Sequence, residues 1–489
     1  MSFTASREDQ NNLDAKPFVR QANAFIQSGH VQEAIKAFDQ ALAIEPKNVV
    51  ALSGRGLAAS FAGDHEGAIK TLKTAYDLAP NESAILLNLA NAHIPVGLDE
   101  EALGYFQKAY DIDDTNTEAS YWIGFLNEKM GDFSKAVTFY ERTIELDPHH
   151  KLAYLQLADV FYAQGQKYDA FSVLAKGEVA LNGDPSITFS RGRLLAKSVP
   201  GWHLPMLHDK ERNDVYEQAI NQLVKPDDIV LDIGTGSGLL AMMAARAGAK
   251  HVYACEMNPV LAAMAREIVA VNNLDDKITI IEKNSAEMVI GEDMPEKADV
   301  LVMEIFDSAI VGEDVMQTMD HAWAVLLKDG ARSIPGSANL YGCLTQCPDI
   351  KKLDQVDMIN GFDLSAMNKL SRPFAHRDMQ LNLAVSEECK RLSEPFFITN
   401  FDFEKPPEME FASETPEVKI KDSGTADSVL LWFDLELAPG LTFSTQDYQL
   451  QNHWRPVSQA LLNDVSCEVG DTKMLQTLYQ GFFNFTVLG

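Results

Sequence analysis

The sequence predicts a multidomain protein in which an all-α repeat solenoid is followed by an α/β domain with a parallel sheet and then by a β-barrel-like domain. Three observations predict this order: small residues recur every 34 positions over 15–184, strand runs alternate with helical runs over 200–335, and β patterns dominate 336–489. Residues 1–14 are expected to form a polar tail. The chain of 489 residues is long enough for several domains of about 150 residues each.

The composition is that of an acidic globular protein. The chain has 71 Asp and Glu against 41 Lys and Arg, which gives a formal net charge of -30. This charge argues against direct binding to nucleic acids or anionic membranes and favours basic protein partners, although solubility alone is the alternative explanation. No apolar run approaches the roughly 20 residues of a membrane span. The five cysteines contain no CxxC pair, so we expect no disulfide framework, no metal site and a cytoplasmic location, with the nucleus as a second option.

Small residues define the repeats of the first segment. Three sets share the 34-residue spacing: Gly29, Gly63, Gly97, Gly131 and Gly165; Ala34, Ala68, Ala102, Ala136 and Ala170; and Ala22, Gly56, Ala90, Gly124 and Ala158. Small side chains are needed where two helices cross closely, and glycine is expected at the turn between them. The pattern resembles five tetratricopeptide repeats, each a helix-turn-helix unit. This resemblance implies a peptide-binding surface; a spacer or an oligomerisation arm is the alternative.

The second segment opens with a buried strand run over 228–233, followed by a glycine-rich turn and an apolar helix that stops at Gly248. Further strand runs over 251–256, 277–282 and 298–305 alternate with helical runs. This alternation predicts a parallel sheet with right-handed crossovers.

The glycine-rich turn provides the first candidate binding site. Its residues of interest are Asp232, Gly234, Gly236 and Gly238. Such a turn lets a cofactor approach the backbone and the helix N-terminus, and its G-x-G-x-G spacing differs from the G-x-G-x-x-G of dinucleotide sites. The next strand ends in Glu256, an acid placed to accept hydrogen bonds from ribose hydroxyls. Together these residues resemble the Rossmann-like class I methyltransferase pattern for S-adenosylmethionine; a tight turn without a cofactor is the alternative.

Two glutamates, Glu304 and Glu313, flank a short loop after the fourth strand. The chain lacks the (Asn/Asp)-Pro-Pro-aromatic sequence with which amide and base methyltransferases end this strand, and the loop instead resembles the double-glutamate loop of protein arginine methyltransferases. A guanidinium is planar, protonated and poorly nucleophilic, so two carboxylates can grip it and draw its charge from the attacking nitrogen. A pair of solvated surface acids is the alternative.

The resemblance implies roles for residues on both sides of this loop. The stretch 203–213 is similar to the family's N-terminal helix, which closes over the cofactor. There Arg212 would pair with the methionine carboxylate of the cofactor, while His203 and Met206 would line the lid. After the third strand, Ser285 and Glu287 would contact adenine.

The last segment contains a hairpin that turns at Pro439-Gly440, and then Asn452-His453-Trp454. This tripeptide is similar to the Thr-His-Trp loop of the family's β-barrel domain. On that resemblance Trp454 stacks on the substrate guanidinium, and His453 pairs with Asp209. A core or edge aromatic pair is the alternative.

The chain is thus identified as a member of the protein arginine methyltransferase family, in the branch with N-terminal tetratricopeptide repeats. The resemblance runs from about Trp202 to the C-terminus and implies methyl transfer from S-adenosylmethionine to arginine in protein substrates that the repeats recruit. The family's functional unit pairs two modules, so we expect a homodimer. A catalytically silent repeat scaffold and a methyltransferase for a small molecule are the alternatives. Ile305 to Ser308 replace the Trp-Met-Gly-Tyr of asymmetrically dimethylating relatives, which favours monomethylarginine as the product.

Overall fold

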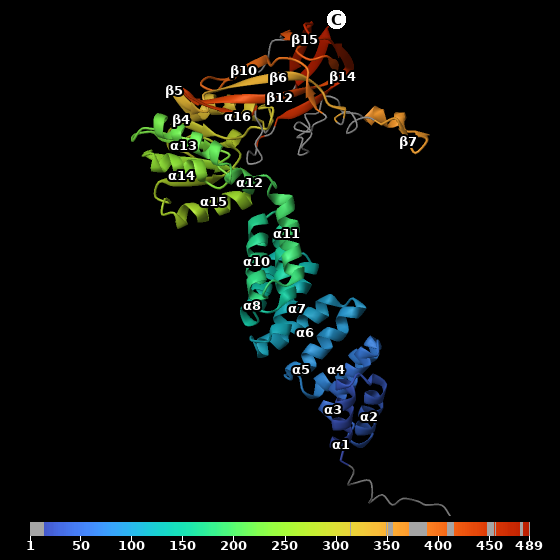
Figure 1. Ribbon diagram of the computed structural model, residues 1–489. Coiled ribbons are helices and arrows are strands. Elements are labelled where there is room, and N and C mark those ends of the chain that lie inside the picture. Colours follow the sequence, from blue (N-terminus) through green and yellow to red (C-terminus); the bar gives the residue numbers. More distant parts are fainter. Residues whose placement is uncertain are drawn as a thin grey trace, which may run out of the picture. The chain divides into compact units, whose positions relative to one another are not determined.

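The computed structural model describes residues 14–312, 314–348, 350, 356–370, 389–407, 415–446, 454, 456–479 and 483–488. The chain divides into two compact units, Met1–Leu195 and Ala196–Gly489, and each is described by itself (Figure 1).

Consecutive antiparallel helices build the first unit, and each packs on its neighbours in the chain. They are α1 (Lys16–Gln27), α2 (Val31–Ile44), α3 (Val49–Phe61), α4 (His65–Leu78), α5 (Ser83–His93), α6 (Asp99–Ile112), α7 (Thr117–Lys129), α8 (Phe133–Leu146), α9 (Lys151–Ala163) and α10 (Lys167–Ala180). Glycines at the turns have positive φ, as at Gly63 (84°) and Gly131 (84°). A Cβ on Gly124 would lie 2.9 Å from the Tyr140 ring, which explains the small residues at helix crossings.

A further helix, α11 (Pro185–Ser198), follows the repeats. Its residues Ile187 and Leu194 are buried against Tyr154 and Leu174 of the array. The helix therefore covers the apolar face that the last helix pair would otherwise expose.

A five-stranded parallel sheet, in the order β3-β2-β1-β4-β5, forms the first half of the second unit, as predicted. The strands are β1 (Ile229–Ile233), β2 (His251–Glu256), β3 (Ile278–Glu282), β4 (Ala298–Met303) and β5 (Leu327–Ile334). The helices are α12 (His203–Leu207), α13 (Lys210–Leu223), α14 (Leu239–Arg246), α15 (Pro259–Val271) and α16 (Val315–His321), with the short 3-10 helix η3 (Ser285–Glu287) and the short π-helix η4 (Ala322–Leu326). All five residues of β1 are buried, which explains why all but Asp232 are apolar.

Antiparallel sheets form the rest of this unit (Figure 1). The larger sheet contains β6 (Ser337–Gln346), β9 (Lys390–Arg391), β10 (Phe396–Asp402), β12 (Gly424–Ala438), β13 (Leu441–Ser444) and β14 (Val457–Cys467). The others contain β7 (Met358–Ile359) with β8 (Phe362–Asp363), and β11 (Glu417–Lys419) with β15 (Thr472–Tyr479) and β16 (Phe483–Leu488); η5 (Ser365–Leu370) follows β8. The predicted hairpin at Gly440 joins β12 to β13, and one apolar core is continuous from the parallel sheet into these strands.

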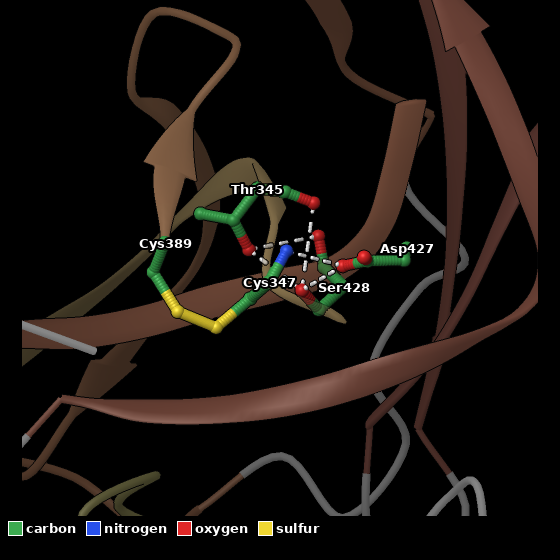
Figure 2. Close-up of a disulfide and its surroundings, with 5 residues drawn as sticks. All are labelled: Thr345, Cys347, Cys389, Asp427 and Ser428. Atoms are coloured by element: carbon green, nitrogen blue, oxygen red, sulfur yellow. Dashed lines mark hydrogen bonds between the residues drawn. A yellow bond between two sulfur atoms is a disulfide. The ribbon is translucent and has the colours of Figure 1, made fainter. Parts of the chain in front are cut away.

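The described residues contain one disulfide, although the spacing of the cysteines indicates no disulfide framework. Cys347 and Cys389 are joined, with their Cα atoms 4.4 Å apart (Figure 2). The pairing of β6 with β9 brings them together across a separation of 42 residues, and such long-range pairing leaves no signal in cysteine spacing. Oδ1 of Asp427 accepts a hydrogen bond from the Cys347 backbone N–H at 2.7 Å and another from the Ser428 hydroxyl at 2.7 Å, which fixes the end of β6.

The described part of the chain contains no helix of the length and apolarity that a membrane crossing requires. Among the same residues, no group of three or more His, Cys, Asp and Glu side chains could hold a metal ion.

Candidate active site

The glycine-rich turn between β1 and α14 is held close to its surroundings. Its three glycines have positive φ: Gly234 (74°), Gly236 (55°) and Gly238 (82°). The N–H groups of Gly234 and Thr235 both donate to the Cys255 carbonyl at 3.0 Å. A Cβ on Gly236 would lie 2.5 Å from the His203 ring, and one on Gly234 would overlap the Ile305 side chain. Residues larger than glycine are therefore excluded at both positions by backbone conformation and by space.

Glu256, the last residue of β2, forms a hydrogen bond with this turn. Its Oε2 accepts from the Gly236 N–H at 3.0 Å, and its Oε1 accepts from the Asn258 N–H at 2.8 Å. Burial raises the pKa of Glu256, and the N–H donors of Asn258 and Gly236 act to lower it. A carboxylate has about four lone-pair positions, so each oxygen can accept a further hydrogen bond from a hydroxyl.

Asp232 lies beneath the same turn and is fully buried. Its Oδ2 accepts a hydrogen bond from the Thr235 hydroxyl at 2.6 Å. Burial raises the pKa of Asp232 to about 7, although the Thr235 hydroxyl acts to lower it. Asp232 therefore stabilises the turn through its hydrogen bond with Thr235.

Helix α12 brings His203 to the turn, and His203 and Met206 of this helix are both buried. The His203 imidazole packs on Gly236, and burial lowers its pKa. Among the described residues, neither ring nitrogen of His203 has a hydrogen-bond partner. Asp209 begins α13 as its N-cap: it is 1% exposed and accepts from the Arg212 N–H at 3.1 Å.

Arg212 is a buried residue and not the surface residue that a charged helix start alone would suggest. Its Nη2 donates to Oε2 of Glu304 at 2.9 Å, and its Nη1 donates to the Asn213 side chain at 2.8 Å. The guanidinium lies 5.0 Å from the centroid of the Tyr216 ring. Side-chain exposure is 3% for Arg212 and 8% for Glu304, so the two charges neutralise each other away from water.

The loop after β4 begins at Glu304. Asp307 organises it: its Oδ1 accepts from the Ala309 N–H and its carbonyl accepts from the Ile310 N–H, both at 3.0 Å. Ile310 is fully buried and has a φ of 73°. Glu313, the predicted second glutamate, lies outside the described residues.

The remaining predicted residues lie at different places. Ser285 is buried in η3 and Glu287 is exposed. Trp454 is 3% exposed, and its indole Nε1 donates to the Phe306 carbonyl at 3.0 Å. His453 lies outside the described residues, so its pairing with Asp209 stays a prediction.

Sequence reasoning missed Tyr216, which places its ring beneath Arg212 and donates its hydroxyl hydrogen to the Met303 carbonyl at 3.1 Å. Its position one helical turn after Arg212 was a usable signal, because residues at i and i+4 share a helix face. Burial raises the pKa of this Tyr216 hydroxyl.

The site fits S-adenosylmethionine in three respects. The glycine turn offers a backbone without side chains, Glu256 offers acceptors for hydroxyls, and Arg212 offers a cation for a carboxylate. Within the described residues, Nε of Arg212 and both ring nitrogens of His203 are buried without hydrogen-bond partners. These polar atoms therefore retain the capacity to bind a polar ligand.

Comparison with known families divides the chain in the same way as the fold. Residues 216–336 match the family described as ribosomal protein L11 methyltransferase (PrmA), and residues 337–470 match the arginine methyltransferase oligomerization subdomain. Residues 19–83, 54–117 and 117–150 match tetratricopeptide repeats.

The relatives are arginine methyltransferases. The chain is 33% identical over 335 residues to an arginine N(omega)-methyltransferase of Streptomyces achromogenes subsp. streptozoticus, covering 68% of this chain and 88% of that protein. It is 30% identical over 369 residues to protein arginine N-methyltransferase 9 of Xenopus laevis, covering 68% of this chain but only 44% of that protein.

A solved structure has the same catalytic fold. The Trypanosoma brucei PRMT1 enzyme-prozyme heterotetrameric complex with AdoHcy matches with a TM-score of 0.50 and 25% identity, over 57% of this chain and 87% of that chain. Because the alignment with the Streptomyces enzyme covers most of both proteins, the chain belongs to the arginine methyltransferase family.

Proposed function

We propose that this protein transfers methyl groups from S-adenosylmethionine to guanidinium nitrogens of arginine in protein substrates that its repeats recruit. The transfer of methyl groups to arginine follows from family membership. The observation that carries the assignment to this site is the buried pair of Arg212 and Glu304 beside the glycine turn.

Different residues around the turn would bind different parts of the cofactor. Gly234, Gly236 and Gly238 would accommodate it against the backbone, Glu256 would accept hydrogen bonds from its ribose hydroxyls, and Arg212 would pair with its carboxylate. S-adenosylmethionine supplies an electrophilic methyl group when bound.

Glu304 would act on the substrate guanidinium. Its carboxylate accepts hydrogen bonds from guanidinium N–H groups and so fixes the plane of the substrate. The negative charge also draws the positive charge away from the nitrogen that attacks, and it does so strongly because the carboxylate is buried. Glu313 is proposed as the second carboxylate. The hydrogen bond that Glu304 accepts from the Arg212 guanidinium supports this proposed role, because the substrate offers the same chemical group.

Three further features remain proposals. Recruitment of protein substrates by the repeats is supported by their match to tetratricopeptide repeats. A homodimer is supported by the match to the oligomerization subdomain over residues 337–470. A cytoplasmic location is favoured by the free thiols of Cys255, Cys343 and Cys467, whereas the disulfide between Cys347 and Cys389 argues against it.

The test is to incubate the purified chain with S-adenosylmethionine labelled in its methyl group and an arginine-rich protein, and then to separate the methylarginines by mass. Labelled methylarginine is expected, and the Glu304→Gln variant should lose at least about 100-fold in rate because it lacks the charge that polarises the guanidinium. A chain that binds S-adenosylhomocysteine but labels no protein would favour the silent scaffold. Full activity of Glu304→Gln would contradict the proposed role of this residue.

A further inference from the structure

Trp454 is buried in the core of the antiparallel sheets formed by β6 to β16, which we call the β domain. Its side chain is 3% exposed. Its ring packs edge-on against Phe433, with centroids 5.4 Å apart, and at a tilt against Phe443, with centroids 5.7 Å apart. Its indole N–H points at the parallel-sheet half of the unit, where it donates to the Phe306 carbonyl at 3.0 Å. The indole therefore joins the β domain to the loop that begins at Glu304.

Phe306 is held from a second side by the same domain. Its ring lies 5.3 Å from the ring of Phe403, which directly follows β10, and its side chain is 4% exposed. Phe306 follows Glu304 by two residues, so a displacement of its backbone also displaces the glutamate. The β domain thus restrains this short segment through a backbone hydrogen bond and a ring contact.

The loop needs such a restraint because part of its backbone is strained. Ile310 has a φ of 73°, a conformation that is a clear outlier for a β-branched residue. Residues in such conformations persist only where the surrounding structure fixes them. The Ile310 side chain is fully buried, and its N–H donates to the Asp307 carbonyl, but these contacts fix residues that follow Glu304 by three and six positions. Trp454 instead fixes Phe306, which is closer to Glu304 in the chain.

We infer that Trp454 is a positioning residue for methyl transfer: its indole N–H holds the Phe306 carbonyl and thereby keeps Glu304 in place against Arg212. This role rests on the proposed function and differs from the stacking on substrate that the resemblance implies. A ring that stacks on a guanidinium contributes mainly to substrate binding. A hydrogen bond that orients a carboxylate contributes mainly to turnover, because small displacements of a catalytic group reduce the rate strongly.

The two roles are separated by Trp454→Phe, which keeps an aromatic ring in the core and removes the N–H donor. Trp323→Phe is the matched control. Trp323 Nε1 also donates to a backbone carbonyl across the same junction, that of Phe403 at 3.3 Å, but it makes no hydrogen bond to the loop of Glu304 in the described residues. For each variant we would measure kcat and KM with an arginine peptide, the Kd for S-adenosylhomocysteine, and amide hydrogen exchange over residues 304–312.

Trp454→Phe should lower kcat by about 10- to 100-fold, with KM and Kd within about twofold of wild type. It should also speed exchange in the loop. Trp323→Phe should leave both kcat and the rate of amide exchange in the loop close to wild type. If Trp454→Phe does not fold, Phe403→Leu loosens the other contact of Phe306 and should give the same selective loss of kcat.

Two results would overturn the inference while leaving the proposed function intact. One is an active wild type with a Trp454→Phe variant of equal kcat. The other is a rise in KM with kcat unchanged, which would support stacking on the substrate. A wild type that methylates no arginine would instead contradict the proposed function itself, and unchanged loop exchange in Trp454→Phe would then reject the positioning role separately.

Discussion

Arg212 and Glu304 form a buried ion pair, with Nη2 of the arginine 2.9 Å from Oε2 of the glutamate. The proposed function gives these residues different ligands, the cofactor carboxylate for Arg212 and the substrate guanidinium for Glu304. In this pair, Glu304 takes the place of the cofactor carboxylate at Arg212, and Arg212 takes the place of the substrate guanidinium at Glu304. A cofactor carboxylate that binds Arg212 weakens its hold on Glu304, which favours binding of the cofactor before the substrate.

Replacement of Arg212 tests this pairing. Arg212→Ala should raise the Kd for S-adenosylhomocysteine at least about tenfold, since a buried cation for its carboxylate is lost. Binding of methylthioadenosine, which has no carboxylate, should change little. Isothermal titration with the two ligands checks this difference, and equal losses for both would place Arg212 outside the carboxylate site.

The same variant should also be less stable by about 3 kcal/mol or more, because the buried charge of Glu304 loses the cation of Arg212. The double variant Arg212→Ala/Glu304→Gln is the control: it should recover much of this stability without recovering affinity for S-adenosylhomocysteine. Urea unfolding measures the stability of each variant.

Asp232 makes the stability of the protein depend on pH. Its native pKa is raised to about 7, chiefly by burial, against an ordinary value of 3.8. The native state therefore binds a proton that the unfolded chain has released, and the contribution of Asp232 to stability should fall as the pH rises from about 4 to 7. Asp232→Asn cannot ionise, so its free energy of unfolding relative to wild type should increase across this window, by at most about 1.4 kcal/mol per pH unit.

Asp299 on β4 supplies the control for this effect. Burial acts to raise its pKa, but the Ile229 N–H and Lys328 outweigh burial and lower the pKa below its usual range. Such a group loses its stabilising effect only as the pH falls below about 4, so Asp299→Asn should show no rising trend between about pH 4 and 7. Urea unfolding measures the difference in free energy of unfolding between Asp232→Asn and the wild type. If this difference does not change with pH, Asp232 is ionised in the native state.

The disulfide should contribute measurably to stability. Closing a loop across the 42-residue separation of Cys347 and Cys389 restricts the unfolded chain by about 4 kcal/mol in the chain-entropy model. Dithiothreitol should therefore lower the free energy of unfolding of the wild type and leave that of Cys347→Ser unchanged. Cys343→Ala, which removes a free buried thiol from β6, the strand that Cys347 directly follows, should keep the sensitivity of the wild type. A wild type indifferent to reductant would mean that the pair is a dithiol in solution.

The parts of the site that were predictable from the sequence are those formed by neighbouring residues. Gly234, Gly236 and Gly238 could be recognised because a tight turn that needs positive φ strongly favours glycine, and Glu256 because it ends the next strand. The contact of Trp454 with Phe306 spans 148 residues and depends on how two domains pack, which no local pattern records. The pairing of Arg212 with Glu304 was missed for a related reason: the resemblance assigned each residue a ligand and gave no reason to pair them.

The fold also contains some features that local sequence predicts and others that it does not. Repeats and parallel strands follow from local periodicity, which is strong in helices and in buried strand runs. The disulfide and the left-handed conformation of Ile310 arise from tertiary structure instead. An isoleucine gives no local reason to expect a positive φ, because only its burial makes that conformation stable.

Removal of the repeats should affect protein and peptide substrates differently. The cut belongs after Leu195, because Ile187 and Leu194 of α11 pack on the array and would be exposed by a cut at its last repeat. The remaining unit, Ala196–Gly489, should fold and bind S-adenosylhomocysteine. Its kcat/KM should fall for protein substrates and change little for short arginine peptides, as measured by methyl transfer. Equal losses on both substrates would mean that the array is part of the catalytic fold and not a recruiter.

The expected product is monomethylarginine, with symmetric dimethylarginine as the next candidate. The product depends on whether a second methyl group fits and on which nitrogen is presented, and steric differences of about 1–3 kcal/mol are enough to decide this. Asp307 occupies the space beside Gly312, where a Cβ would overlap its carboxylate group, and it also accepts the Ala309 N–H. The acid therefore tightens the loop that follows Glu304.

Asp307→Ala should loosen this loop and raise the fraction of dimethylated product, while total turnover falls. Asp299→Asn, whose side chain lies away from the loop and bonds to Lys328, is the control and should leave the product unchanged. Hydrolysis of the methylated protein followed by mass spectrometry separates the three methylarginines. A wild-type product dominated by asymmetric dimethylarginine would contradict the prediction, because Ile305 to Ser308 would then permit the geometry that we expect them to exclude.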